Sequence, residues 1–330
     1  MGLGVSAEAM TQAPYYDIFN GDADGICALH QLRLAEPREA ALVTGVKRDI
    51  RLLDQVARVQ GAELTVLDIS LDSNRAPLLQ LLESCRVFYV DHHYAGDLPH
   101  SPNLIAHLDP SPETCTSLIV DTLLSGRFRG WAVAAAFGDN LHDSARKAAA
   151  ALHLTEPQVE RLRELGELMN YNGYGQKVAD LHVPPQALYA AVQPYADPLA
   201  FCEEAQILAL LRQGFADDLR RARAVAPLRQ TPHGRIFVFP AEKWANRIAG
   251  VFSNEKAREM EDAAHALLVD NGEGSFMVSV RAPLARRTGA DSLCRAFPTG
   301  GGRAAAAGIN ALPAGQMEVF FQKFSEVFFP

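Results

Sequence analysis

Short apolar runs alternate with stretches of helical periodicity over the first third of the chain. The runs are continuous rather than alternating, which is typical of strands in a parallel sheet that is covered on both faces. Repeated strand and helix units therefore predict an α/β fold with a doubly wound parallel sheet. The expected strands are 15–19, 41–44, 64–67, 86–90 and 103–108, and the expected helices are 26–34, 49–59 and 75–83.

The rest of the chain changes character twice. Residues 118–124, 131–152, 157–169 and 201–224 have helical spacing, with a turn at 170–175. Strand signals return at 235–239, 266–269 and 276–280, separated by helices at 246–264 and 292–296, while 319–328 fits either a helix or a strand. The predicted organisation is a flexible tail at 1–14, a first domain at 15–200, a helical linker at 201–228 and a smaller α/β domain at 229–330.

Composition narrows the class of protein. The formal net charge of −8 disfavours binding of long double-stranded DNA, because such binding depends on Lys and Arg at many phosphates. The five cysteines lack metal-site spacing, which indicates reduced thiols and a cytoplasmic location. No apolar run reaches the ~18 residues of a membrane helix, so we expect no membrane association.

Acidic and imidazole side chains follow three of the expected strands. Because the carboxyl ends of parallel strands share one edge of a sheet, these side chains should lie close together. A single Asp there is more often a helix cap, but several crowded carboxylates favour a divalent cation that neutralises them. Such a site suits hydrolysis of phosphate esters. The residues are Asp22 and Asp24 after the first strand, Asp68 after the third, and Asp91, His92 and His93 after the fourth.

Two further motifs extend this pattern. Asp139 lies in a helical region and would by itself be read as a helix-terminal residue. In the C-terminal domain, Ser279 and Arg281 precede the glycine run Gly300, Gly301 and Gly302, which Arg303 follows. Glycines allow backbone amides to approach a phosphate and Arg can bind it with two donors, although a glycine-rich turn is the alternative interpretation.

Together these motifs resemble the DHH family of phosphoesterases, in the family's order and over both domains. The resemblance implies that 15–200 is the DHH catalytic domain and that 229–330 is the DHH-associated substrate-binding domain. It also implies two divalent metal ions, with Mn²⁺ favoured over Mg²⁺, that activate a water molecule. Asp22, Asp24, Asp68, His92 and Asp139 would be metal ligands, Asp91 a ligand or a residue that orients His92, and His93 a contact to the substrate phosphate or a proton-transfer group. Ser279, Arg281, Gly300, Gly301, Gly302 and Arg303 would bind substrate.

Two positions depart from the family pattern. Asn20 lies where many members place a metal-binding His, so one metal site would be weaker or completed by water. Arg303 replaces a His of the glycine motif, which keeps a phosphate contact but removes a group that titrates near neutral pH.

The resemblance leaves several activities open. The first hypothesis is a nanoRNase-like phosphodiesterase that hydrolyses short oligonucleotides or linear dinucleotides. The alternatives are a polyphosphatase or pyrophosphatase, a 3′-phosphoadenosine-type nucleotide phosphatase, and a nucleotide-binding scaffold whose site has decayed. A short nucleic acid or phosphorylated nucleotide is the expected partner, and a homodimer is left open.

Overall fold

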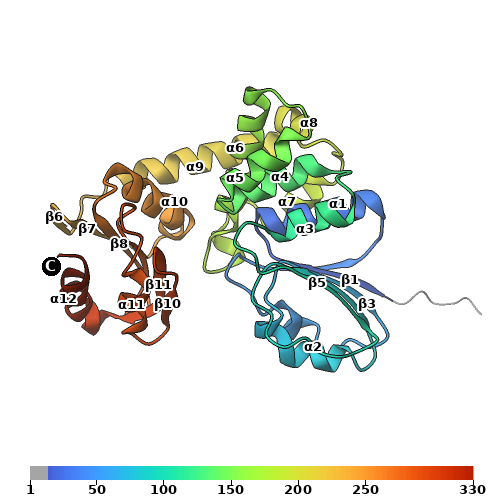
Figure 1. Cartoon of the computed structure of the whole chain (residues 1–330), viewed down its shortest axis with the longest axis horizontal. Coiled ribbons are helices and arrows are strands. Elements are labelled where there is room, and N and C mark those ends of the chain that lie inside the picture. Colours follow the sequence, from blue (N-terminus) through green and yellow to red (C-terminus); the bar gives the residue numbers. More distant parts are fainter. Residues whose placement is uncertain (1–13, 330) are drawn as a thin grey trace, which may run out of the picture. The chain divides into compact units, whose positions relative to one another are not determined.

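The computed structural model describes residues 14–329, which divide into two compact units (Figure 1). The first unit comprises residues up to Asn170 together with Pro185–Ala205, and the second comprises Tyr171–Pro184 and the chain from Gln206 onward. Apart from Pro14, the predicted tail at 1–14 lies outside the described residues. Among the described helices, none is both long enough and apolar enough to cross a membrane.

A five-stranded parallel sheet forms the centre of the first unit. Its strands are β1 (Tyr15–Phe19), β2 (Ala41–Thr44), β3 (Glu63–Leu67), β4 (Arg86–Asp91) and β5 (Leu104–Leu108), in the order β2-β1-β3-β4-β5. Strand β2 lies on one side of β1 and β3 lies on the other. The order in which strands are added to the sheet therefore reverses at β1. In open α/β sheets, ligands bind at the carboxyl ends of the strands near such a point.

Helices cover both faces of this sheet. Helix α2 (Arg75–Leu81) lies on one side, whereas α1 (Ala23–Ala35), α3 (Thr116–Leu123) and α4 (Arg129–Gly138) lie on the other (Figure 1). Interior positions such as Ile18, Val66 and Tyr89 are completely buried, as expected for strands covered on both faces. The predicted doubly wound parallel sheet is therefore confirmed.

Further helices complete the first unit. They are α5 (His142–Ala150), α6 (Glu156–Gly173), α7 (Pro185–Val192) and α8 (Pro198–Glu204). Helices α4 and α6 approach closely at two glycines, because a Cβ added to Gly166 would lie 1.9 Å from the carbonyl oxygen of Ala134 and 2.8 Å from the amide nitrogen of Gly138. This contact fixes α4, which carries Asp139 at its end.

The second unit contains a mixed sheet. Its elements are α9 (Gln206–Arg223), β6 (Arg229–Thr231), β7 (Gly234–Phe239), α10 (Lys243–Glu259), β8 (Ala264–Asp270), β9 (Ser275–Arg281), α11 (Ala290–Arg295), β10 (Gly300–Gly302), β11 (Ala306–Pro313) and α12 (Met317–Phe328). The strand order is β10-β11-β9-β8-β7-β6, with only the β7 and β8 pair parallel. Phenylalanines of α12, including Phe320 and Phe324, pack into its core.

Several sequence-based element predictions were wrong. The segment 49–59 forms only a 3₁₀ turn at Leu52–Gln55, and the expected helix 131–152 is divided into α4 and α5. Helix α6 continues through most of the expected turn at 170–175, and 201–224 is divided at Ala205. Strands β10 and β11 were not predicted, and 319–328 proves to be helical.

Candidate metal centre

Asp22 has two roles at the end of β1. Its side chain caps α1, because Oδ1 accepts hydrogen bonds from the backbone N–H groups of Asp24 at 3.0 Å and Gly25 at 3.2 Å. Its other oxygen, Oδ2, forms an ion pair with Nζ of Lys47. Burial raises the pKa of Asp22, but the Lys47 ammonium and these hydrogen bonds outweigh that effect and leave the pKa lowered.

Asp24 connects α1 to the start of α3. Its two carboxylate oxygens accept hydrogen bonds from the backbone N–H groups of Thr116 and Ser117, both at 2.7 Å. The Ser117 hydroxyl donates back to the Asp24 carbonyl oxygen at 2.9 Å. The completely buried Asp24 carboxylate is thus held in place by amides at the N-terminus of α3.

Asp68 follows β3 in a strained backbone conformation, with φ at +59°. The Thr116 hydroxyl lies 3.4 Å from its Oδ1, and Nε2 of His92 lies 3.5 Å from the same oxygen. Burial raises the pKa of Asp68 well above its usual range, and repulsion from Asp24, Asp22 and Asp139 adds to the effect. Asp68 is therefore the carboxylate that most needs an added cation.

The Asp91, His92 and His93 triplet separates into two functions. Asp91, which ends β4 and is completely buried, pairs through Oδ1 with Nδ1 of His93 at 2.7 Å. His92 instead faces Asp68 and lies 3.9 Å from Oδ2 of Asp139. Burial lowers the pKa of His93, but the hydrogen bond and charge of Asp91 raise it more. The contact observed for Asp91 is with His93, and the roles expected from the sequence, a metal ligand or a residue that orients His92, stay predictions.

Asp139 reaches the cluster because α4 ends there. It forms the C-cap of α4, and the next residue, Asn140, has φ at +61°, which turns the chain before α5 begins. Burial and repulsion from Asp24 and Asp22 raise the pKa of Asp139, although the Lys47 ammonium opposes them. The division of the predicted helix is therefore what presents Asp139 to the strand ends.

Sequence reasoning missed two residues of the cluster. Lys47 follows β2, and its Nζ donates to Oδ1 of Asp139 at 3.0 Å and to Oδ1 of Asn170 in α6 at 2.8 Å, in addition to Asp22. The position of Lys47 directly after an expected strand was a usable signal. Asn170 carried no comparable local signal.

The donor atoms fit a divalent cation. In the described chain, two groups of side chains each place their ligand atoms within 4.8 Å of one another: Asp68 with His92 and His93, and Asp24 with His92 and Asp139. Carboxylate oxygen with neutral imidazole nitrogen suits a first-row divalent metal such as Mn²⁺. Such an ion would neutralise the Asp68 carboxylate, whose pKa is raised by burial and by the neighbouring carboxylates.

The predicted substrate-binding residues lie in the second unit. Ser279 and Arg281 are on β9, and the half-buried Arg281 guanidinium donates to Oδ1 of Asn254 at 2.8 Å. Burial lowers the pKa of Arg281. Because this guanidinium donates only to an amide oxygen and a carbonyl oxygen in the bonds described, its charge is one that an anion would complement.

The glycine run forms the short strand β10, which pairs antiparallel with β11. A Cβ at Gly300 would lie 1.8 Å from the Cys294 carbonyl oxygen, and Gly302 has φ at +137°, so both positions require glycine for the fold. A Cβ at Gly301 would meet no atom within 4 Å, which leaves it open to close approach by a ligand. Arg303 is exposed directly after the strand.

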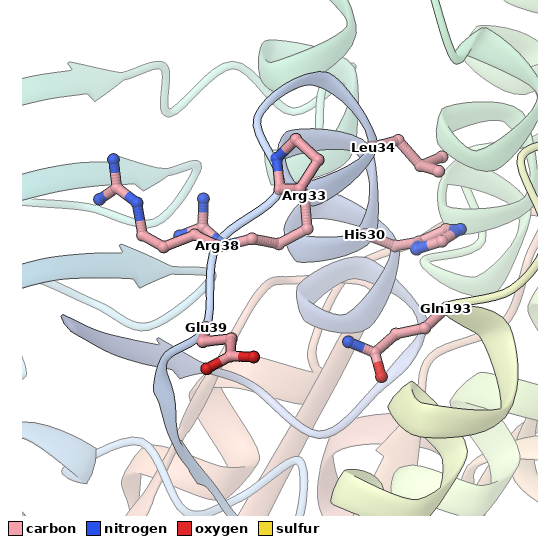
Figure 2. A pocket seen from close by; sticks show the side chains of 7 residues that line it. His30, Arg33, Leu34, Arg38, Glu39 and Gln193 are labelled. Atoms are coloured by element: carbon pink, nitrogen blue, oxygen red, sulfur yellow. The ribbon is translucent and has the colours of Figure 1, made fainter.

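A cavity of about 340 Å³ lies at the opposite end of α1 from Asp22 (Figure 2). His30, Arg33 and Leu34 of α1 line it together with Gln193. Burial lowers the pKa of His30 to about 4, against the effect of its contact with the Tyr195 carbonyl oxygen at 2.7 Å, and Arg33 is paired with Asp17. His30 and Arg33 already have protein partners outside the cavity, so the carboxylate cluster is the stronger candidate for chemistry.

Comparison with solved structures identifies the fold. A DHH-domain protein that belongs to a family of ribosomal proteins superposes with a TM-score of 0.61 at 13% identity, covering 95% of this chain and 86% of that one. The exonuclease RecJ bound to manganese gives 0.61 at 15% identity over 95% and 89%. The pGpG-specific phosphodiesterase PggH from Vibrio cholerae gives 0.54 at 13% identity over 95% and 98%.

No family model matches the sequence, and no curated protein matches it either. The chain has the fold of DHH-domain proteins, which confirms the resemblance seen in the motifs at the level of the fold.

Proposed function

We propose that this protein is a metal-dependent phosphodiesterase that hydrolyses short oligonucleotides or linear dinucleotides. The observation that carries the proposal is the convergence of Asp24, Asp68, His92 and Asp139 at one sheet edge, with a raised pKa at Asp68. RecJ with manganese and the pGpG-specific phosphodiesterase share the fold and support both parts of the proposal.

The proposed metal ligands are Asp68, His92, Asp139 and Asp24. A bound divalent cation would neutralise phosphate charge and lower the pKa of a coordinated water. Asp24 would have a second task, since its hydrogen bonds to Thr116 and Ser117 hold α3 beside the cluster.

His93 is proposed to act on the phosphate itself. The His93 side chain is 42% exposed, while its Nδ1 is held by the completely buried Asp91. That arrangement leaves Nε2 to donate a hydrogen bond to a phosphate oxygen or a proton to the leaving oxygen. The contact with His92, whose ring is tilted by 56° with the centroids 4.4 Å apart, places this donor next to a proposed metal ligand.

Substrate length is proposed to be limited by charge. A processive nuclease holds a long strand in a basic groove, whereas this chain has a net charge of −8. Ser279, Arg281, Gly301 and Arg303 of the second unit would hold one phosphate or a few phosphates of a short strand. A cytoplasmic location suits such a substrate.

The test compares a 5′-phosphorylated diribonucleotide, a pentanucleotide, 3′-phosphoadenosine 5′-phosphate and tripolyphosphate, each with Mn²⁺ or Mg²⁺. We expect the wild type to release mononucleotides from the two oligonucleotides. The His93→Ala variant should release them more slowly by a factor of about 10² or more. The exposed Asp54→Asn variant is the matched control and should keep full activity. Turnover of tripolyphosphate alone would identify a polyphosphatase, and nucleotide binding without turnover of any substrate would identify a decayed scaffold.

A further inference from the structure

A lysine ammonium lies among the carboxylates of the candidate metal centre. Nζ of Lys47 donates to Oδ2 of Asp22, to Oδ1 of Asp139 at 3.0 Å and to Oδ1 of Asn170 at 2.8 Å. These three oxygens come from the start of α1, the end of α4 and the interior of α6. An ammonium has three N–H donors, so each of these oxygens can accept one of them.

The backbone that carries Lys47 is held by the two residues that precede Asp22. Nδ2 of Asn20 donates to the Lys47 carbonyl oxygen at 3.2 Å. A Cβ added to Gly21 would lie 2.0 Å from the Gly45 carbonyl oxygen, so only glycine lets the loop approach this closely. The position of the ammonium is thus built into the turn that presents Asp22.

The hydrogen bond between Asn20 and the Lys47 backbone links the residue that departs from the DHH pattern to the lysine. Asn20 occupies the position where the DHH pattern often has a metal-binding His, and its amide instead supports the Lys47 backbone. The side that lacks an imidazole ligand is therefore the side that contains a protein cation. Asp22 is also absent from both groups of described side chains whose ligand atoms lie within 4.8 Å of one another.

We propose that the Lys47 ammonium replaces one of two divalent cations, so that the centre binds a single divalent metal ion. The ion would be held by His92, which belongs to both groups of ligand atoms, with the carboxylates of Asp68, Asp24 and Asp139 drawn from the two groups, while Lys47 neutralises the Asp22 side. This inference rests on the metal dependence in the proposed function and specifies its stoichiometry.

The position of the ammonium, and not the total charge, favours one ion over two. The four carboxylates of Asp22, Asp24, Asp68 and Asp139 carry four negative charges when ionised. One divalent ion together with the ammonium supplies three positive charges and leaves a net charge of −1. Two divalent ions with the ammonium would supply five and leave a net charge of +1, so the total charge alone does not fix the number of ions. A second ion on the Asp22 side, however, would lie beside the Lys47 ammonium that already shares the Asp22 carboxylate, and the two like charges would repel each other.

The experiment is metal counting on the full-length protein. After equilibrium dialysis against Mn²⁺, bound manganese per chain is measured by elemental analysis, and electron paramagnetic resonance distinguishes an isolated ion from an exchange-coupled pair. The wild type should bind one Mn²⁺ per chain and give the signal of an isolated ion. Lys47→Arg, which keeps the positive charge, should also bind one.

Removing the charge should open the second position. The double variant Asn20→His with Lys47→Met restores an imidazole and deletes the ammonium, and it should bind two ions with a coupled signal. Lys147→Met, on the exposed face of α5, is the matched control and should bind one.

The outcomes separate this inference from the proposed function. Two Mn²⁺ ions in the wild type would overturn the role of Lys47 and leave a metal-dependent phosphodiesterase intact. A double variant that folds and still binds one ion would also overturn it. Absence of bound Mn²⁺ from the wild type would instead overturn the proposed metal dependence itself.

Discussion

Replacing Asp68 with Asn should change the stability of the protein in opposite directions with and without metal. Asp68 is 2% exposed, and its raised pKa reflects burial and repulsion from three other carboxylates. A raised pKa means that the folded state binds a proton more readily than the unfolded state. Its contribution to stability is therefore present below the unfolded pKa and is lost as pH rises through the folded pKa.

The size of the effect follows from the separations in the cluster. Two carboxylate oxygens 4.8 Å apart, the limit found for Asp24 and Asp139, repel each other by about 3.5 kcal/mol at an effective dielectric constant of about 20. Asp68 experiences such repulsion from several sides, offset by attraction to Lys47. The neutral amide should therefore stabilise the metal-free protein at pH 7 by about 1–3 kcal/mol, or ~2–10 °C in Tm.

Mn²⁺ should reverse the order of stability, so that the wild type becomes more stable than Asp68→Asn. At a free concentration 100 times its Kd, the ion stabilises the wild type by about 2.7 kcal/mol, whereas Asp68→Asn loses a central ligand and most of that gain. The assay is thermal unfolding of both proteins at pH 7 with EDTA or with a Mn²⁺ series, and Asp54→Asn should follow the wild type throughout. A lower Tm for Asp68→Asn in EDTA, or equal stabilisation of both proteins by Mn²⁺, would refute the reasoning.

Three further predictions concern the rest of the molecule. Gly166→Ala would force a Cβ to within 1.9 Å of a carbonyl oxygen of α4, and should destabilise the first unit by about 1–3 kcal/mol or more in denaturant unfolding. Burial lowers the pKa of His30 and of His265 to about 4, so stability in thermal scans should fall as pH decreases from about 6.5 towards 4, and replacing both by Gln should flatten that dependence. Arg247→Met would leave the buried Asp218 carboxylate without its two-donor partner, and should cost about 3–5 kcal/mol by urea unfolding, whereas equal stability would contradict a structural role for this pair.

The strands of the parallel sheet could be predicted well, because burial on both faces gives continuous apolar runs in the sequence. The expected helix at 49–59 failed for a tertiary reason. The Asn74 side chain donates to the Ile50 carbonyl oxygen at 2.6 Å and accepts from the Leu53 amide at 3.2 Å. These bonds use backbone groups that a helix would need, so apolar spacing alone was misleading. Strands β10 and β11 were missed because glycine and alanine carry weak strand preference.

Some residues of the candidate site could likewise be predicted from the sequence, and others could not. Asp22, Asp24, Asp68 and the Asp91 to His93 triplet follow strands, so the geometry of a parallel sheet is enough to predict that they lie together. Asp139 could be included only through the resemblance, because its placement depends on the backbone turn at Asn140. Lys47 was overlooked because only acidic and imidazole residues were considered at the strand ends.

The path of the chain between the two units limits how the protein can be dissected. The chain passes from one unit to the other after Asn170, after Pro184 and after Ala205. Within Tyr171–Pro184, the Tyr171 hydroxyl donates to Asp218 at 2.5 Å, and the Asp180 carbonyl oxygen accepts from Arg247 at 2.5 Å. A recombinant fragment that stops at 205 would keep this segment but lose its packing partners, so boundary choice for expression should avoid a single cut there.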